Sequence, residues 1–201
     1  MSEVVTRRGA LGAGAYAGSA LLFNTNLLNT GLANARPAAT PECHDGDAAT
    51  LPEIEGPFFK PSSPERTNLF EPGMAGQPLD LAGYVLSLSC KPVSGALIDF
   101  WQADGRGEYD NLGFRLRGHQ FADAQGRYRL SSVVPGLYEG RTRHIHVKIQ
   151  PPNGRLLTTQ LYFPREPKNS SDGLFRHELL ISAEKSAGLV VGRFDFVLDV
   201  W

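Results

Sequence analysis

The most informative stretch of the sequence is residues 143–150, in which two histidines, His144 and His146, stand two positions apart. The odd positions from 145 to 149 are all aliphatic, and the even positions from 144 to 150 are all polar. Successive side chains of a β-strand point to opposite faces, so an aliphatic face packed into a core would leave both histidines on the other face. Two imidazoles that project together can bind one metal ion. A pair of solvated or hydrogen-bonded histidines on a polar sheet face is the alternative at this point.

Two tyrosines extend this candidate set. Tyr109 stands on a Gly-rich loop after a predicted strand, and Tyr138 follows a Pro-Gly-Leu turn. Either tyrosine alone is more typical of a packing residue. Together with the histidines, they offer phenolate oxygen and imidazole nitrogen, a donor set suited to a hard trivalent cation such as Fe(III). A bound cation would also lower the pKa of a phenol from about 10 far enough to keep it ionised.

Other metal chemistries fit the sequence less well. The usual catalytic zinc sites need a third histidine or an acidic ligand, and neither lies near the pair. A cupin site needs a glutamate shortly after the second histidine, where this chain has Val-Lys-Ile-Gln. A copper-handling protein is disfavoured because Met74 and both cysteines lie far from the histidine pair in the sequence.

The segments that position these residues are predicted to be β-strands. Six short runs are rich in β-branched and aromatic residues and are separated by turn residues. They are residues 79–89, 96–102, 127–134, 143–149, 157–163 and 194–200. No capped segment of a dozen residues with helical periodicity lies between them. The sequence therefore predicts an all-β fold, an antiparallel β-sandwich around a single core.

Composition and charge narrow the choice of partners. The 201 residues include 20 Lys and Arg against 21 Asp and Glu, a formal net charge of -1. This balance lacks the basic surplus that non-specific binding of nucleic acid requires, so no nucleic-acid partner is expected. No run approaches 18 charge-free apolar residues, so no transmembrane span is predicted. The 22 Gly and 14 Pro exceed average usage but stay below the disordered range, which favours one loop-rich domain.

The first 35 residues have the anatomy of an export signal. Arg7 and Arg8 precede a weakly apolar stretch at 10–23, and Ala-Asn-Ala at 33–35 matches a small-residue cleavage site. The paired arginines resemble the twin-arginine class of signals, which direct the export of folded proteins. We expect residues 1–35 to be a signal peptide and the mature protein to be periplasmic or extracellular, without membrane attachment after cleavage. The alternative is an N-terminal arm that happens to carry two arginines.

The mature chain divides into two predicted parts. Residues 36–78 are rich in Pro, Gly, Asn and Ser, which is typical of an extended arm, and residues 79–201 hold the predicted sandwich core. Cys43 and Cys90 both survive cleavage, and two thiols in an exported protein more often pair than remain free. A disulfide between them is therefore predicted, with a stabilisation of about 4 kcal/mol from loop closure. Two independent buried thiols are the alternative.

Five segments of the chain, taken together and in order, resemble the intradiol ring-cleavage dioxygenases. These are non-haem Fe(III) enzymes that open catechols between the two hydroxyls. The segments are EIEGPFF at 53–59, DFWQADGRGEY at 99–109, PGLY at 135–138, RTRHIH at 141–146 and LTTQLYF at 157–163. They span about 110 residues, and the family fold is a β-sandwich, in agreement with the strand pattern.

The resemblance assigns roles to the four candidate metal ligands. Tyr109 and His144 correspond to iron ligands retained throughout turnover, and His146 corresponds to the axial histidine. Tyr138 corresponds to the axial tyrosinate that substrate displaces. The implied reaction takes a small-molecule catechol and O2 to a muconate-type diacid.

Two further residues are assigned catalytic roles by the same match. Arg141 and Gln160 would face the bound ring, and Arg141 would stabilise negative charge that develops on the substrate, since a guanidinium stays protonated. Without the resemblance, Arg141 could be a surface or structural arginine, and Gln160 an ordinary hydrogen-bonding strand residue.

The chain departs from the familiar intracellular members in two ways. Those members have a helical N-terminal dimerisation segment or paired unlike subunits, whereas this chain has an export signal and a Pro-rich arm. The oligomeric state, a homo-oligomer included, is therefore left open. Only Glu139 and Gly140 separate Tyr138 from Arg141, where those members carry a longer loop over the pocket. The short loop resembles the exported branch of the family and leaves the accepted ring substituents open.

A second hypothesis is an exported β-sandwich binding module that keeps the scaffold without turnover. Composition does not distinguish it from an enzyme. The four candidate ligands favour the enzyme, because a binding module has no need to keep them in register.

Overall fold

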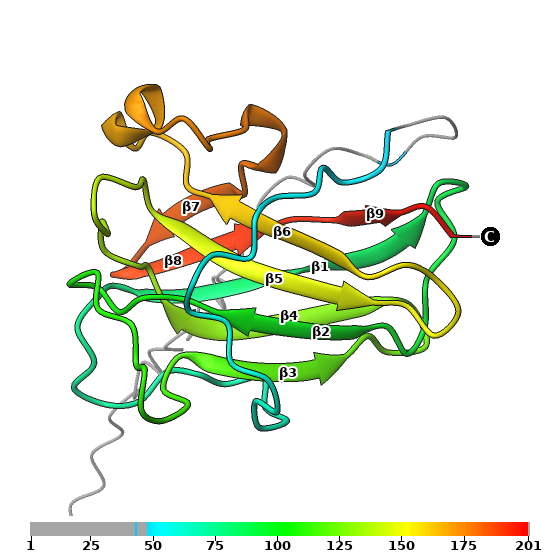
Figure 1. Ribbon diagram of the computed structural model, residues 1–201, viewed down its shortest axis with the longest axis horizontal. Helices are drawn as coiled ribbons and strands as arrows, with labels where there is room; N and C mark the ends of the chain where they lie inside the picture. Colours follow the sequence, from blue (N-terminus) through cyan, green and yellow to red (C-terminus); the bar gives the residue numbers. More distant parts are fainter. Residues whose placement is uncertain (1–42, 44–47, 201) are drawn as a thin grey trace, which may run out of the picture. The chain divides into compact units, whose positions relative to one another are not determined.

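The computed structural model describes residue 43 and residues 48–200, which form a sandwich of two β-sheets (Figure 1). The strands are β1 (Pro78–Ser87), β2 (Leu97–Trp101), β3 (Arg117–Phe121), β4 (Arg127–Val133), β5 (His144–Gln150), β6 (Leu157–Tyr162), β7 (Ser182–Ser186), β8 (Leu189–Arg193) and β9 (Phe196–Leu198); two 3-10 helices are η1 (Pro167–Ser171) and η2 (His177–Leu179). The predicted all-β sandwich is confirmed. The predicted signal peptide, residues 1–35, lies outside the described residues.

Each sheet has a distinct strand order. One sheet runs β3-β2-β5-β6 with antiparallel neighbours throughout, and it carries the two histidines on β5. The other runs β4-β1-β8-β7, with β9 also paired to β1. In this second sheet β8 and β9 lie parallel to β1, so the sandwich is antiparallel except at these two pairings.

Three observed strands were not among the six predicted runs. Most residues of β7, a strand at the edge of its sheet, are exposed, so no buried face imposes an alternating pattern on them. The neighbouring β8 contains Gly192 at a position that packs against Leu81 and Ile181, where a side chain would have continued the pattern. The third, β3, has polar and glycine residues at most of its positions.

Apolar residues of both sheets meet in one core. Ile145, Val147 and Ile149 of β5 are fully buried, and Leu81 and Val85 of β1 enter the same cluster from the opposite sheet. Burial of apolar surface contributes about 25 cal/mol per Å² and is the main favourable term in such a sandwich. The aliphatic face of β5 thus fixes the side to which its histidines point.

The segment that precedes β1 lies across both sheets. Its backbone is tied by hydrogen bonds from the N–H of Glu53 to the carbonyl of Thr158 on β6 and from the N–H of Arg66 to that of His119 on β3, each 2.8 Å long. Further along, the N–H of Leu69 donates to Ser131 on β4 at 2.7 Å. This segment, called the covering segment below, brings residues 53–59 over the face of the sheet that carries the histidines.

Cys43 and Cys90 form the predicted disulfide. Their Cα atoms are 5.7 Å apart, and the two residues are separated by 47 positions in the chain. The bond therefore fastens the beginning of the covering segment to the turn that follows β1.

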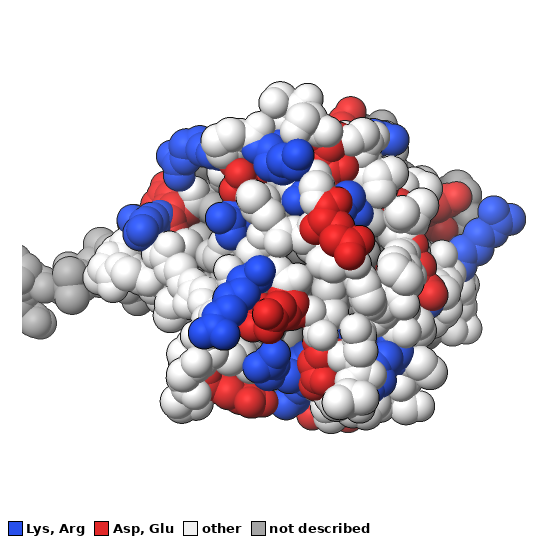
Figure 2. Space-filling view, turned by 60° about the vertical axis from the view of Figure 1, so that its left-hand side comes forward, with Lys and Arg blue, Asp and Glu red and all other residues white. Residues whose placement is uncertain are grey.

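The surface carries charges of both signs. Figure 2 shows Lys and Arg side chains interspersed with Asp and Glu on the face that it presents, which agrees with the near-zero net charge. No helix among residues 48–200 is long and apolar enough to cross a membrane.

Candidate metal centre

The two histidines lie side by side on β5, beneath the covering segment. Each is only 3% exposed, and their ring centroids are 4.8 Å apart with nearly perpendicular planes. The ring of Trp101, on the adjacent strand β2, stacks parallel to that of His146 at 4.8 Å. The histidine face of the sheet is thus buried, which rules out the solvated pair.

The hydrogen bonds of His144 fix its tautomer. Nδ1 lies 2.7 Å from the carbonyl oxygen of Thr142, and a carbonyl can only accept, so Nδ1 carries the proton. Nε2 then presents its lone pair 3.2 Å from Oη of Tyr109. Burial lowers the pKa of His144 to about 4, so the ring is neutral at pH 7 and able to bind a cation.

Tyr109 is held between two loops. Gly107, with φ of +87°, packs against the carbonyl of Leu137, which brings the loop of Tyr109 against the loop of Tyr138. The two tyrosine rings stand at right angles with centroids 5.5 Å apart. Phe58 from the covering segment stacks on Tyr109 at 4.4 Å and meets Tyr138 edge-on at 5.2 Å. One phenylalanine thus supports both tyrosines.

A buried arginine on β3 supports the same loop. Arg117 is 1% exposed; its Nη1 donates to the carbonyl of Phe58, and its Nε donates to that of Asp110 at 3.1 Å. The residue after Tyr109 and the phenylalanine stacked on it are therefore held by one guanidinium. Burial raises the pKa of Tyr109, although the charges of Arg141 and Arg117 act in the opposite direction.

Tyr138 stands at the start of a tight turn. The N–H of Arg141 donates to the carbonyl of Tyr138 at 2.6 Å, and the two residues between them, Glu139 and Gly140, have φ of +37° and +83°. The ring of Tyr138 is partly exposed. Desolvation and the neighbouring Glu139 raise its pKa.

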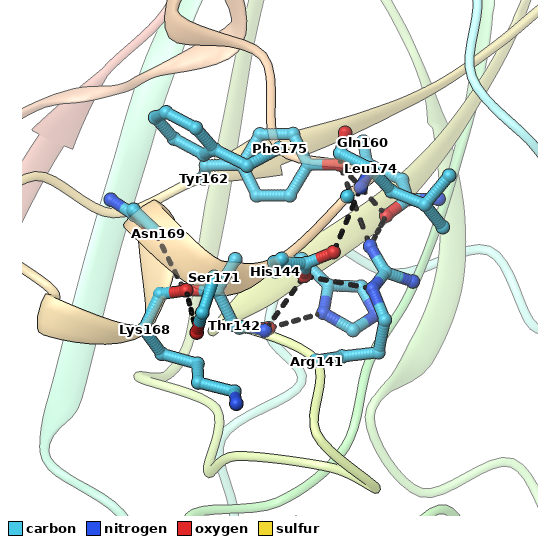
Figure 3. Close-up of polar contacts among 12 residues, drawn as sticks. Arg141, Thr142, His144, Gln160, Tyr162, Lys168, Asn169, Ser171, Leu174 and Phe175 are labelled. Carbon is cyan, nitrogen blue, oxygen red and sulfur yellow. Dashed lines mark hydrogen bonds and ion pairs between the residues drawn. The ribbon is translucent and has the colours of Figure 1, made fainter.

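Arg141 and Gln160 are bonded to one another (Figure 3). Nη2 of Arg141 donates to Oε1 of Gln160 at 2.7 Å, and its Nε donates to Oδ2 of Asp172 at 2.8 Å. Gln160 in turn donates from Nε2 to the carbonyl of Ile54 at 2.9 Å. The guanidinium is thereby fixed in orientation, beside the strand that carries the histidines.

Asp172 was not predicted from the sequence. Burial alone would raise its pKa, but N–H donors from Thr142 and Leu174 and the guanidinium of Arg141 outweigh burial and hold the pKa below its usual value. Its position depends on η1, which brings residues 166–172 back to the turn at Arg141. The Asp-Gly pair at 172–173 signals only a turn.

The structure brings all six predicted site residues into one cluster. Tyr109 contacts His144, Tyr138 and the ring of His146, while Arg141 and Gln160 adjoin it through their shared hydrogen bond. Their roles as ligands and catalytic groups stay predictions.

A groove of about 570 Å³ lies on the outer face of β4, β1 and β8. It shares no residue with the tyrosine and histidine cluster. Oxygen and nitrogen donors converge in the cluster, so the cluster and not this groove is the candidate reaction site.

Gly56 is a second site residue that the sequence did not single out. It has φ of +73°, and a Cβ added to it would lie 3.2 Å from Cε1 of His146. The backbone of the covering segment thus lies directly against this imidazole, where an added Cβ would crowd the ring and strain the backbone.

Comparison with known proteins agrees with this arrangement. A family model described as "Dioxygenase" matches residues 54–200. Catechol 1,2-dioxygenase of Pseudomonas sp. (strain EST1001) is 29% identical over 158 residues, 65% of this chain and 52% of that protein. The protocatechuate 3,4-dioxygenase beta chain of Burkholderia cepacia is 32% identical over 119 residues, 50% of this chain and 51% of that protein. The chain thus spans about half the length of these curated relatives.

Solved structures show the same likeness. The dioxygenase domain of a dioxygenase and carbohydrate-binding protein fusion from the cellulolytic bacterium Streptomyces sp. SirexAA-E is 53% identical, with a TM-score of 0.75; the match covers 77% of this chain and 100% of that one. The 3-chlorocatechol 1,2-dioxygenase of Rhodococcus opacus 1CP is 28% identical, with a TM-score of 0.72, and the match covers 78% and 75%. Because the family model matches residues 54–200, which is most of the chain, the chain belongs to the intradiol dioxygenase family.

Proposed function

We propose that this protein is an Fe(III)-dependent intradiol dioxygenase that cleaves a catechol between its two hydroxyls with O2 and releases a muconate-type diacid. The observation that carries the proposal is the 3.2 Å approach of Tyr109 Oη to His144 Nε2, within a cluster that also holds Tyr138 and His146. Membership of the intradiol dioxygenase family supports the same reaction.

The side chains of this cluster fit a ferric ion. Two phenols and two imidazoles are hard to borderline donors, as Fe(III) prefers. His144 turns its lone pair toward Tyr109, while its other nitrogen is occupied by a backbone carbonyl, the arrangement common to metal-binding histidines. Because burial raises the pKa of Tyr109, its phenolate form needs a cation beside it. Tyr109, Tyr138, His144 and His146 would hold the ion.

Bound Fe(III) would supply a Lewis acid that holds both catechol oxygens and activates the ring toward O2. Tyr138 would be the side chain that makes room for the substrate, and its phenolate would accept a proton from a catechol hydroxyl. Tyr109 would stay in place because Phe58 stacks face to face on its ring and Arg117 holds the carbonyl of the next residue, whereas Tyr138 meets Phe58 only edge-on. The two tyrosines therefore have different tasks.

Arg141 supplies a fixed positive charge beside the substrate. Its Nε and Nη2 are engaged by Asp172 and Gln160, and among the described residues its Nη1 has no hydrogen-bond partner. Nη1 is therefore the atom that faces negative charge on the substrate. A charge held in position before the reaction stabilises a developing anion without reorganisation.

We also propose that the protein is exported through its twin-arginine-type signal. The disulfide between Cys43 and Cys90 supports this location, since such bonds persist in oxidising compartments. Intact-mass measurement of the mature protein, recovered from the periplasm or the medium, should give a chain that begins near Arg36 and contains no free thiol. Full-length protein that stays in the cytoplasm would contradict the proposal.

Replacement of Gly56 by alanine should weaken iron binding about tenfold, within the range for residues that orient a metal ligand. The new Cβ would press on the ring of His146 and would also strain the backbone. Iron affinity is measured by competition with a chelator. Gly73→Ala is the matched control, because Gly73 has a similar φ of +84° but nothing within 4 Å of an added Cβ. Equal iron affinity in the two variants would show that Gly56 does not position His146.

Metal content tests the proposed cofactor. Protein purified without chelators should contain one iron per chain and should be red to brown, because tyrosinate bound to Fe(III) absorbs visible light. Colourless protein that turns over catechols at full rate, or full occupancy by zinc with turnover, would refute the assignment.

A further inference from the structure

The segment between β6 and β7 returns to the loop that leads into β5. Three of its side chains, at positions 166, 169 and 172, flank or lie within η1. A 3-10 helix has three residues per turn, so side chains three positions apart lie above one another on one face. They accept hydrogen bonds from three consecutive residues of the loop: Glu166 from Arg143 at 2.6 Å, Asn169 from Thr142 at 2.5 Å, and Asp172 from Arg141 at 2.8 Å.

The carboxylate of Asp172 faces hydrogen-bond donors at both of its oxygens. Oδ2 accepts from Nε of Arg141 and from the N–H of Thr142, each at 2.8 Å. Oδ1 accepts from the N–H of Leu174 at 2.9 Å, and the side chain is only 2% exposed. A carboxylate accepts at both oxygens, whereas a carboxamide has one acceptor oxygen and one donor nitrogen. An asparagine of the same shape would therefore leave at least one of these donors without its acceptor.

One oxygen of Asp172 connects the arginine of the site to a candidate metal ligand. The N–H of Thr142 donates to Oδ2, and the carbonyl of the same residue accepts from Nδ1 of His144 at 2.7 Å (Figure 3). Thr142 is fully buried, and its hydroxyl is held by Asn169. The carbonyl that orients the imidazole thus takes its position from the same carboxylate that orients the guanidinium.

We propose that Asp172 is a positioning residue that holds Arg141 and His144 in one fixed geometry relative to each other. The inference rests on the proposed function, since the reaction gives both residues their tasks. Asp172 acts through these two residues and needs no contact with the metal or the substrate. Without it, Arg141 keeps its bond to Gln160 but loses the second bond that fixes the plane of the guanidinium.

A double-mutant cycle on kcat tests the action through Arg141. The proteins are the iron-loaded full chain and its variants Asp172→Asn, Arg141→Ala and the double variant, all at saturating catechol. Asp172→Asn should lower kcat at least about tenfold, because misplacement of a group by about 1 Å can cost about 100-fold in rate. In the Arg141→Ala background the same substitution should change kcat less than about twofold, since the residue through which Asp172 acts is gone.

The affinity for Fe(III), measured by competition with a chelator, tests the action through His144 without turnover. Asp172→Asn should weaken this affinity about tenfold, as expected for a residue that orients a metal ligand. Arg141→Ala should keep the affinity of the parent, because His144 still bonds to Thr142.

Asp123→Asn is the matched control for both measurements. Asp123 also accepts from two backbone N–H groups and from Nε of an arginine, but it lies on the turn between β3 and β4, outside the cluster. Its variant should match the parent in kcat and in iron affinity. Thermal unfolding of every variant checks that each is folded.

The possible failures are distinguishable. Equal fold losses of kcat from Asp172→Asn in both backgrounds, or no loss in either, would overturn the action through Arg141. An iron affinity of Asp172→Asn equal to that of the parent would overturn the action through His144. If the parent binds iron but cleaves no catechol, the proposed function fails, and the iron affinities still decide the inference. A loss confined to Asp172→Asn then supports it, and equal affinities in all variants overturn it.

Discussion

His144→Ala should give a folded protein that no longer retains iron at one ion per chain. The substitution removes the nitrogen lone pair that faces Oη of Tyr109, and it leaves that hydroxyl buried without this partner. Loss of a residue that merely orients a ligand weakens metal affinity by about 10 to 100-fold, so loss of a ligand should exceed that range. Metal analysis of protein purified without chelators, together with its visible absorption, measures the effect.

A matched control separates this effect from a general loss of histidine. His177 is exposed on η2, and the cluster does not include it, so His177→Ala should retain iron and colour. Circular dichroism should show the same sheet content in both variants. Stoichiometric iron in His144→Ala would remove His144 from the ligand set.

Tyr138→Phe should retain most of its iron but lose turnover by at least about 100-fold. Tyr109, His144 and His146 remain to hold the ion, whereas the phenolate that accepts the substrate proton is gone. A positioned proton acceptor typically contributes a factor of about 100 to 10,000 to the rate. Single-turnover measurements with catechol, beside the iron content of the same sample, separate the two effects.

Tyr84→Phe serves as the control for this variant. Tyr84 is partly buried on β1, in the other sheet, and lines the groove that shares no residue with the cluster. Tyr84→Phe loses only a hydroxyl distant from the cluster and should turn over catechol at the rate of the parent. A Tyr138→Phe variant as fast as the parent would mean that Tyr138 is not the proton acceptor.

The sequence predicts those strands that have one face in the core. β5 is the clearest case, since alternation of aliphatic and polar residues places Ile145, Val147 and Ile149 in the core and both histidines opposite. β3 could not be predicted in this way because it buries the charged side chain of Arg117, one of whose carbonyl partners belongs to Phe58, 59 residues away in the sequence. Such partners become known only when the covering segment is in place.

The candidate ligands could be predicted because their chemistry is specific to the residue type. The side chains of tyrosine and histidine can bind a metal ion through oxygen and nitrogen, and the order of these four residues along the chain matched a known family. Gly56 and Phe58 could not be assigned roles in the same way, because a glycine or a phenylalanine does not reveal which ring it will contact. Asp172 likewise takes its role from the fold, through the return of η1 to Arg141.

The most direct test of the central claim is the product formed from catechol under ¹⁸O2 by the purified, iron-loaded protein. Intradiol cleavage breaks the bond between the two hydroxylated carbons, and the resulting muconate should carry one ¹⁸O atom in each carboxyl group, less any exchange with water. Mass spectrometry of the product measures both atoms. A semialdehyde from cleavage outside the hydroxyls, a quinone, or a diacid without ¹⁸O would contradict the proposed reaction.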